Sequence, residues 1–296
     1  MKRSVTLLFL PIVLFFVSCN KDLSNQNTVN PPGSTSGYND STLLSKYIEL
    51  DTTFTVPSDT ASKTIYSYDS QKRLSRAEQY IYDNTGSITQ SYVSTFVYNG
   101  TDTFPLRLYK KDLSTNKIDS TYLTYNNSGF VIKDSTVKGD FSPSPGYVHT
   151  LVNNISILAD SVRNLYFYYN SSGILIDKDS VTKAQVKNVN SVIQEKVYSH
   201  LFLPSVLKLD FTFDGKTNPL YKVTVHYPYY WINDQVYRAQ QNNYTDAIVY
   251  LGASFRRHLK YAYTYNSNNL PVQALISNTD PANPPDITKV KYYYTK

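Results

Sequence analysis

The sequence predicts an all-β protein, a many-stranded antiparallel meander that forms either a closed barrel or a partly open, barrel-like sheet. Three observations predict it: apolar and polar residues alternate at period two, turn motifs of Asn, Asp and Gly recur between the alternating stretches, and aromatic residues are abundant. The 296 residues include 29 Tyr, 13 Phe and 1 Trp. A hydrophobic share of 41% is enough to bury a core and excludes an intrinsically disordered chain.

The first eighteen residues are typical of a lipoprotein signal peptide. Lys2 and Arg3 give a positive start, and the apolar stretch 5–17 is too short to span a bilayer. Phe16-Val17-Ser18-Cys19 follows it and resembles a bacterial lipobox, although Phe16 stands where Leu is usual. The sequence therefore predicts cleavage before Cys19 and attachment of acyl chains to this residue, the only cysteine, which would hold the mature protein to a membrane.

Residues 19–40 are rich in Asn, Ser, Thr, Pro and Gly and predict a flexible tether that spans on the order of 25 Å. Asn20-Lys21-Asp22 resembles, in partial form, the signal that sends lipoproteins of the Bacteroidota to the cell surface. We therefore expect an outer-membrane lipoprotein at the cell surface, or otherwise on the periplasmic face. Loss of Lys2 and Arg3 lowers the formal charge from +6 to +4, and the remaining basic residues are dispersed, which argues against nucleic-acid binding.

Residues 41–296 are expected to form one antiparallel β domain. Side chains two residues apart share one face of a strand, so each alternating set should line one face. These sets are Tyr66/Tyr68 opposite Ile65/Ser67, Leu106/Leu108, Leu209/Phe211/Phe213, Tyr261/Tyr263/Tyr265 and Tyr292/Tyr294. Helical spacing occurs only in the stretch 153–163, which we allow as one short helix.

A recurrent turn separates the strands: an aromatic residue ends one strand, Asn or Asp bonds to the nearby backbone, and Gly or Asn supplies a positive φ. It occurs at Tyr68-Asp69, Tyr82-Asp83, Tyr98-Asn99, Tyr125-Asn126, Tyr169-Asn170, Phe213-Asp214 and Tyr265-Asn266. The segments 122–132 and 166–176 match at a spacing of 44 residues, and Phe211 to Asp214 continue the pattern, which suggests an eroded internal repeat. These turns predict successive hairpins.

The turn pattern, together with the segments 211–220 and 263–271, resembles a family of secreted Bacteroidota lipoproteins of unknown function with a porin-like β fold. It is also similar to tyrosine-aspartate repeat proteins. The resemblance covers roughly residues 60–296, with the lipobox added at the N-terminus. It implies a soluble, many-stranded antiparallel barrel and brings no catalytic residues with it. A barrel that faces lipid is the less favoured alternative, because the faces opposite the aromatics carry Ser, Thr, Asn and Lys.

Motifs for catalysis, cofactors or metals are scarce, so we expect no enzyme, no cofactor and no metal site. Gly215-Lys216-Thr217 has Asp210 where a phosphate loop needs glycine, and Ser254 lacks the second glycine of a nucleophile elbow. The four histidines (His149, His200, His226 and His258) do not have metal-ligand spacing. Asp177 and Asp179 share one strand face, and we favour a solvated strand end that discourages edge pairing over calcium binding or acid–base chemistry.

Tyr229, Tyr230 and Trp231 are the candidate ligand-binding residues, because aromatic rings precede a long polar segment that contains amide side chains. Flat rings beside amides suit the apolar face and hydroxyls of a sugar; the simpler interpretation is that Trp231 packs into a barrel end. We therefore expect a non-enzymatic surface lipoprotein that binds a glycan, peptide or lipid. The alternative is a structural envelope or assembly component without a small-molecule site.

Overall fold

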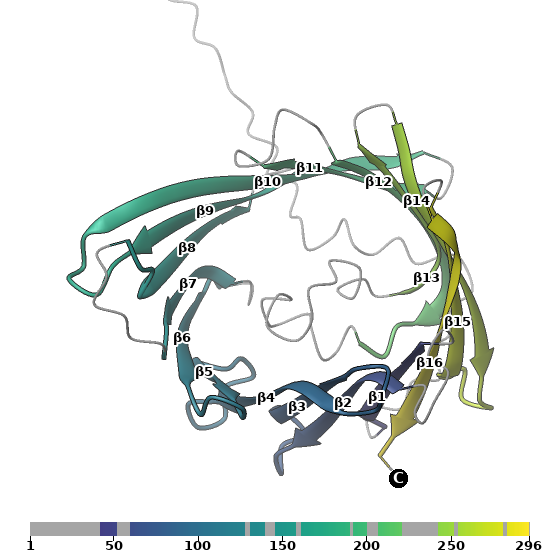
Figure 1. The fold of residues 1–296 in the computed structure, drawn as a ribbon, viewed down its shortest axis with the longest axis horizontal. Coiled ribbons are helices and arrows are strands. Elements are labelled where there is room, and N and C mark those ends of the chain that lie inside the picture. The colour runs from purple at the N-terminus through teal and green to yellow at the C-terminus, as the bar shows by residue number, and fades with distance from the viewer. Residues whose placement is uncertain are drawn as a thin grey trace, which may run out of the picture.

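A computed structural model describes residues 42–51, 60–127, 131–139, 146–157, 161–189, 192–199, 207–220, 242–251, 254–280 and 283–295. Sixteen strands form one closed antiparallel barrel, in which each strand pairs with its neighbours in sequence and β16 pairs with β1 (Figure 1). The strands are β1 (Leu44–Asp51), β2 (Thr60–Tyr68), β3 (Leu74–Tyr82), β4 (Ile88–Val97), β5 (Arg107–Asp112), β6 (Ile118–Tyr125), β7 (Val131–Val137), β8 (Thr150–Ile157), β9 (Ser161–Tyr169), β10 (Leu175–Val189), β11 (Val192–Ser199), β12 (Leu207–Thr217), β13 (Asn242–Leu251), β14 (Ser254–Tyr265), β15 (Pro271–Asp280) and β16 (Asn283–Tyr294).

The all-β prediction is confirmed, and the sheet is the closed form of the meander. The short helix expected in 153–163 is wrong, because the described part of this stretch belongs to β8, which ends at Ile157, and β9, which begins at Ser161, and the two strands pair antiparallel. Its Asn and Ser residues are compatible with either structure, so the spacing of a few aliphatic residues was a weak guide. The described residues include no helix long and apolar enough to cross a membrane.

Neighbouring strands are antiparallel, so odd-numbered strands begin at one rim of the barrel and even-numbered strands end there. At the terminal rim, β1 begins and β16 ends, and Leu43 and Thr295 exchange hydrogen bonds of 3.0 and 2.8 Å. The turn that starts at Asp69 lies at the same rim. The opposite rim carries the turns that start at Asp83 and Asp112.

One face of the sheet is buried and lines the interior of the barrel. The larger core cluster runs along the inner face of neighbouring strands, from β15 and β16 through β1 to β5, and includes Ala274, Tyr47 and Leu108. Leu220, which follows β12, packs in the same cluster. A second cluster joins Phe211 of β12 to Tyr244 of β13, whose ring centroids are 5.2 Å apart.

The predicted alternation is confirmed on this inner face. Tyr66 is buried and Ser67 is exposed, and the rings of Tyr261 and Tyr263 stack with centroids 6.3 Å apart. Leu108 is fully buried, but Leu106, predicted to share its face, is 56% exposed because it precedes β5 at the rim. Alternation therefore predicts which side chains point to the inner face, but a side chain on that face is buried only if it lies away from the rim.

On the outer face, several tyrosine rings lie opposite cationic side chains on neighbouring strands. Lys46 lies 4.0 Å from the ring centre of its register partner Tyr293, and Lys63 lies 4.9 Å from that of Tyr80. The guanidinium of Arg107 is likewise 4.4 Å from the ring centre of Tyr122, its partner on β6. Such pairs combine apolar contact with charge that stays in water.

Four of the predicted turns share one hydrogen-bonding pattern. The side-chain oxygen of the first residue accepts bonds from the backbone N–H groups two and four positions later, at Asp69, Asp83, Asn170 and Asn266. The fourth residue has a positive φ in each turn: Lys72 (62°), Gly86 (82°), Gly173 (74°) and Asn269 (58°). Asp and Asn satisfy the backbone equally well here, so the predicted turn chemistry is confirmed at these positions.

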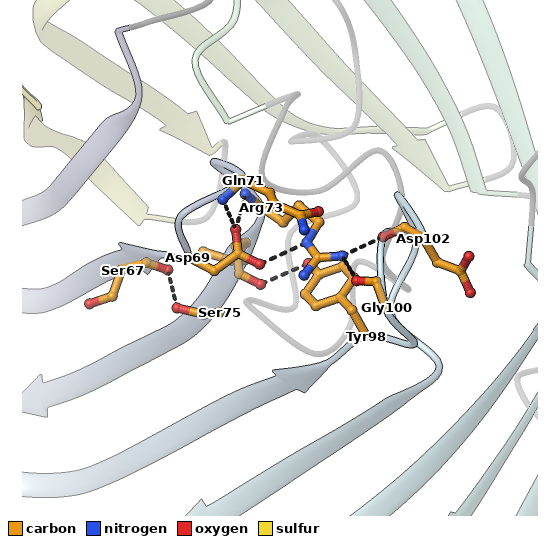
Figure 2. Close-up of polar contacts among 9 residues, drawn as sticks. Ser67, Asp69, Gln71, Arg73, Ser75, Tyr98, Gly100 and Asp102 are labelled. Atoms are coloured by element: carbon orange, nitrogen blue, oxygen red, sulfur yellow. Dashed lines mark hydrogen bonds and ion pairs between the residues drawn. The ribbon is translucent and has the colours of Figure 1, made fainter.

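Arg73 joins two neighbouring turns at the terminal rim (Figure 2). Its Nε lies 2.7 Å from Oδ2 of Asp69, and one terminal nitrogen donates 2.8 Å bonds to the carbonyl oxygens of Gly100 and Asp102. The guanidinium also lies 4.2 Å from the ring centre of Tyr98. Burial raises the pKa of Asp69, but hydrogen bonds from the backbone and side chain of Arg73 outweigh it, and the net shift is downward.

Tyrosines near the ends of four even-numbered strands close the terminal rim. Their hydroxyls donate to carbonyl oxygens at the start of the preceding strand: Tyr68 to Leu44, Tyr98 to Leu74, Tyr125 to Pro105 and Tyr294 to Pro271, at 2.7–2.9 Å. Each bond joins the two strands of one hairpin at the end opposite its own connection. This explains why an aromatic residue so often stands before the turn.

One expectation about the turns needs correction. Asp214-Gly215 is not a hairpin corner: it lies within β12, where Phe213 pairs with Tyr244 and Thr217 pairs with Asn242, so the intervening residues bulge. The 44-residue spacing also places β6 and β9 three strands apart and antiparallel, so their similar sequences end at opposite rims. Ser128 and Gly129, which carry part of the match, lie outside the described residues, so the internal repeat stays a prediction.

Candidate functional site

The described residues contain a polar groove at the opposite rim, on the inner face of the barrel. Its volume is about 590 Å³, and it is lined by Tyr92, Lys110, Asp112, Thr115, Lys117, Asp119, Lys138, Gly146, Tyr147 and Val148. These residues come from β4, β5, β6, the turn between β5 and β6, and the connection from β7 to β8. The pairing of consecutive strands from β4 to β8 therefore brings the lining residues together.

The turn after β5 forms one wall of the groove. Oδ1 of Asp112 accepts bonds from the backbone N–H of Ser114 at 2.8 Å and from its hydroxyl at 2.6 Å. Asn116 takes a φ of 59°, and the backbone N–H of Asp112 donates to the carbonyl of Lys117. The Ser114 hydroxyl bond is the main reason that the pKa of Asp112 lies below its ordinary value, so this carboxylate is charged at neutral pH.

The other wall is fixed by Asp119, which joins β6 to the segment after β7. Its Oδ2 lies 2.9 Å from Nζ of Lys138, and its Oδ1 accepts a 2.9 Å bond from the backbone N–H of Gly139. Gly139 lies so close to β6 that an added Cβ would stand 2.3 Å from the carbonyl oxygen of Ile118. Both oxygens of Asp119 therefore hold the wall in place.

Lys110 and Tyr92 extend the groove along the strands. Nζ of Lys110 lies 4.4 Å from the ring centre of Tyr92, and the Tyr92 hydroxyl donates to Oε1 of Gln90 at 3.2 Å. The site therefore combines ammonium groups, a flat aromatic ring and hydroxyl donors. Such a set can bind a polar ligand by charge, hydrogen bonding and stacking.

The sequence contained a signal for this groove that was not recognised. Lys110 and Asp112 are two residues apart and share one face of β5, and Lys117 and Asp119 have the same spacing where the turn leads into β6. The two pairs flank a single turn, which brings them together. The third part, Lys138 with Gly139, depends on the pairing of β6 with β7, and no local pattern marks it.

The residues predicted to bind ligand or lipid are not described by the structure. Tyr229, Tyr230 and Trp231 lie in 221–241, and Cys19 lies in 1–41, both outside the described residues. His200 and His226 also lie outside them. These predictions therefore stay predictions.

Asp177 and Asp179 lie on the inner face of β10, opposite Tyr168 and Tyr166 of β9. Each carboxylate accepts a bond from the next backbone N–H, at 2.8 and 2.6 Å. Pairing of β10 with β11 begins only at Val181, so among the described residues β9 alone pairs with this part of β10. The position is compatible with the expected role in discouraging edge pairing.

One histidine–carboxylate pair lies on the outer face, away from the groove. Nε2 of His258 is 2.7 Å from Oδ1 of Asp246, while Thr212 bonds to the carboxylate at 3.3 Å and not to the imidazole. His149 lies beside Thr150, with 3.2 Å between Nδ1 and Oγ1. The described part of the chain contains no group of three or more His, Cys, Asp or Glu arranged to hold a metal ion.

Comparison with known proteins bears on the fold alone. No protein-family model and no curated protein matches the sequence. Among solved structures, a porin-like protein from Bacteroides uniformis ATCC 8492 is similar with a TM-score of 0.53 and 13% identity, over 85% of this chain and 96% of that chain. A porin-like protein from Bacteroides vulgatus ATCC 8482 has a TM-score of 0.47 and 10% identity, over 86% of this chain and 99% of that chain. The porin-like β fold predicted from the turn pattern is therefore confirmed.

Proposed function

We propose that this protein is a non-enzymatic, lipid-anchored outer-membrane protein, displayed at the cell surface, whose barrel binds a glycan in the groove at the opposite rim. The groove carries the proposal, because among the described residues it gathers ammonium groups, carboxylates and aromatic rings in one opening. Its volume of about 590 Å³ lies within the roughly 300–1,000 Å³ of small-molecule sites. The alternative is a structural envelope component, favoured by the burial of most inner aromatic rings.

The outer face of the barrel supports attachment by lipid in preference to insertion of the strands. Charged side chains lie on the outer face of strands around the ring, namely Lys63, Glu78, Arg107, Lys111, Lys133, Lys178, Lys260 and Lys291. A Lys or Arg on the lipid face of a barrel costs about 2–4 kcal/mol at the bilayer midplane. A barrel with this outer face is more stable in water, and membrane attachment would then come from Cys19.

Replacing Cys19 with Ala should abolish attachment, because the acyl chains have no other site. Cells that express the full-length protein can be labelled with an alkyne analogue of palmitate and fractionated after a carbonate wash. We expect the native protein in the washed membranes with label, and the Cys19→Ala variant without label and largely released. Ser24→Ala, in the same tether, is the control and should behave as the native protein. Label on the Cys19→Ala variant would show that the lipid anchor is assigned to the wrong residue.

A glycan array tests the binding role directly. We expect the purified full-length protein, kept in detergent, to bind a subset of glycans, and an excess of the soluble form of a bound glycan to displace it. Failure to bind every glycan on the array would overturn the binding role and leave the structural alternative.

A further inference from the structure

The geometry points to an acidic saccharide, carboxylated or sulfated, as the ligand of the groove; this inference rests on the proposed glycan-binding function. Three lysines, Lys110, Lys117 and Lys138, line the groove together with two carboxylates, Asp112 and Asp119. The lining therefore carries an excess of positive charge, which favours a ligand with negative groups.

The two carboxylates offset only part of this charge, because Asp119 pairs with Lys138 and leaves Lys110 and Lys117 against Asp112. Oδ1 of Asp112 accepts bonds from Ser114 and Thr115 at 2.6–3.3 Å, within its own turn. Asp119 accepts from the backbone of Gly139 and holds Lys138 at 2.9 Å. These carboxylates shape the turn and position one ammonium group.

The aromatic residues distinguish a sugar acid from a simple anion. The ring of Tyr92 lies beneath the ammonium group of Lys110, and Tyr147 lines the groove from the connection before β8. A phosphate or sulfate ion would use the lysines alone. A pyranose ring with a carboxylate or sulfate would also gain apolar contact with tyrosine, which amphipathic rings provide.

Strand β5 supplies a matched control. Lys110 is in register with Ser94 and Asp119 on the inner face, whereas the next residue, Lys111, is in register with Val93 and Ile118 on the outer face. Lys110→Gln and Lys111→Gln therefore remove the same charge from adjacent positions on opposite faces. Only the first should affect a ligand inside the groove.

The experiment compares fluorescent trigalacturonic acid and a sulfated chondroitin hexasaccharide with neutral galactotriose, using fluorescence anisotropy on the full-length protein in detergent. We expect at least one acidic probe to bind tenfold or more tightly than the neutral one, and its binding to weaken as salt rises from 50 to 500 mM. Lys110→Gln and Lys117→Gln should each weaken binding several-fold, while Lys111→Gln should leave it unchanged. Thermal unfolding of each variant checks that the barrel remains intact.

The other outcomes separate this inference from the proposed function. Equal or tighter binding of the neutral sugar would overturn the acidic preference and leave glycan binding in place. Loss of affinity in Lys111→Gln alone would place the ligand outside the groove. Displacement by inorganic sulfate at the same concentration as by the saccharide would reduce the site to an anion site. Binding of none of the probes, together with an unresponsive glycan array, would overturn both proposals.

Discussion

Replacing Gly139 with Ala is expected to destabilise the protein by about 3 kcal/mol or more, because the added methyl group has no space. Its Cβ would lie 2.3–2.6 Å from three backbone atoms of Ile118, and backbone atoms cannot rotate away as a side chain does. Relief requires the segment after β7 to move from β6, which would break the bond from Gly139 to Asp119. Urea unfolding followed by tryptophan fluorescence and circular dichroism measures the loss.

Gly146 provides the control for this experiment, since it also lines the groove but has no atom within 4 Å of an added Cβ. Gly146→Ala should change stability by no more than about 1 kcal/mol, with a small gain expected from the less flexible unfolded chain. Equal stability of the two variants would contradict the close approach of Gly139 to β6. If Gly139→Ala unfolds at the normal urea concentration but no longer binds ligand, the segment after β7 has moved away from β6 without destabilising the whole barrel.

Raising the pH above about 10 should unfold the barrel cooperatively, because three inner tyrosines must lose a proton that the folded state retains. Burial raises the pKa of Tyr125, Tyr263 and Tyr265 above the ordinary value, and the hydrogen bond from Tyr265 to Asp214 adds to the shift. A raised tyrosine pKa means that the folded state binds the proton more tightly than the unfolded state. The stabilisation is complete below the ordinary pKa and is lost as pH rises, at no more than about 1.4 kcal/mol per pH unit for each such group.

Phenolate absorbance near 295 nm and circular dichroism should be followed together from pH 8 to 12.5. We expect exposed tyrosines to ionise first without loss of structure, and the buried group to ionise in one step that coincides with unfolding. Tyr263→Phe keeps the ring but removes one of these hydroxyls, so its unfolding midpoint should move to higher pH. Gradual ionisation of all tyrosines, with the sheet intact, would contradict the burial of these side chains.

The sequence predicted the fold well because its determinants are local. Alternation of Tyr261, Tyr263 and Tyr265 follows from the pleat of one strand, and the turns at Asp69 and Asn170 satisfy their own backbone within five residues. The same locality caused the errors. Asp214 carries turn chemistry but is used in a bulge, which depends on its pairing with β13.

The candidate site was harder to predict because its residues come from several strands and connections, and a single stretch of sequence does not show which of them line the same side of the barrel. Aromatic residues predict a sugar site at Trp231, which lies outside the described residues, and the groove made chiefly by Lys and Asp around the turn after β5 is a second candidate. Alternation places Lys110 on the same strand face as Leu108 and Lys111 on the other face, but it does not say which face lines an interior groove. Only the closed ring of strands assigns one to the interior and the other to the surrounding solvent.

The seam, where Leu43 before β1 is hydrogen-bonded to Thr295 after β16, also bears on how the molecule would be oriented on a cell. Both ends of the barrel chain meet at one rim, and the groove opens at the other, a full strand length away. A lipid attached upstream of the first strand would pull that seam toward the bilayer. The lysine-lined mouth would then point outward, where large polymers that cannot cross the envelope would reach it first.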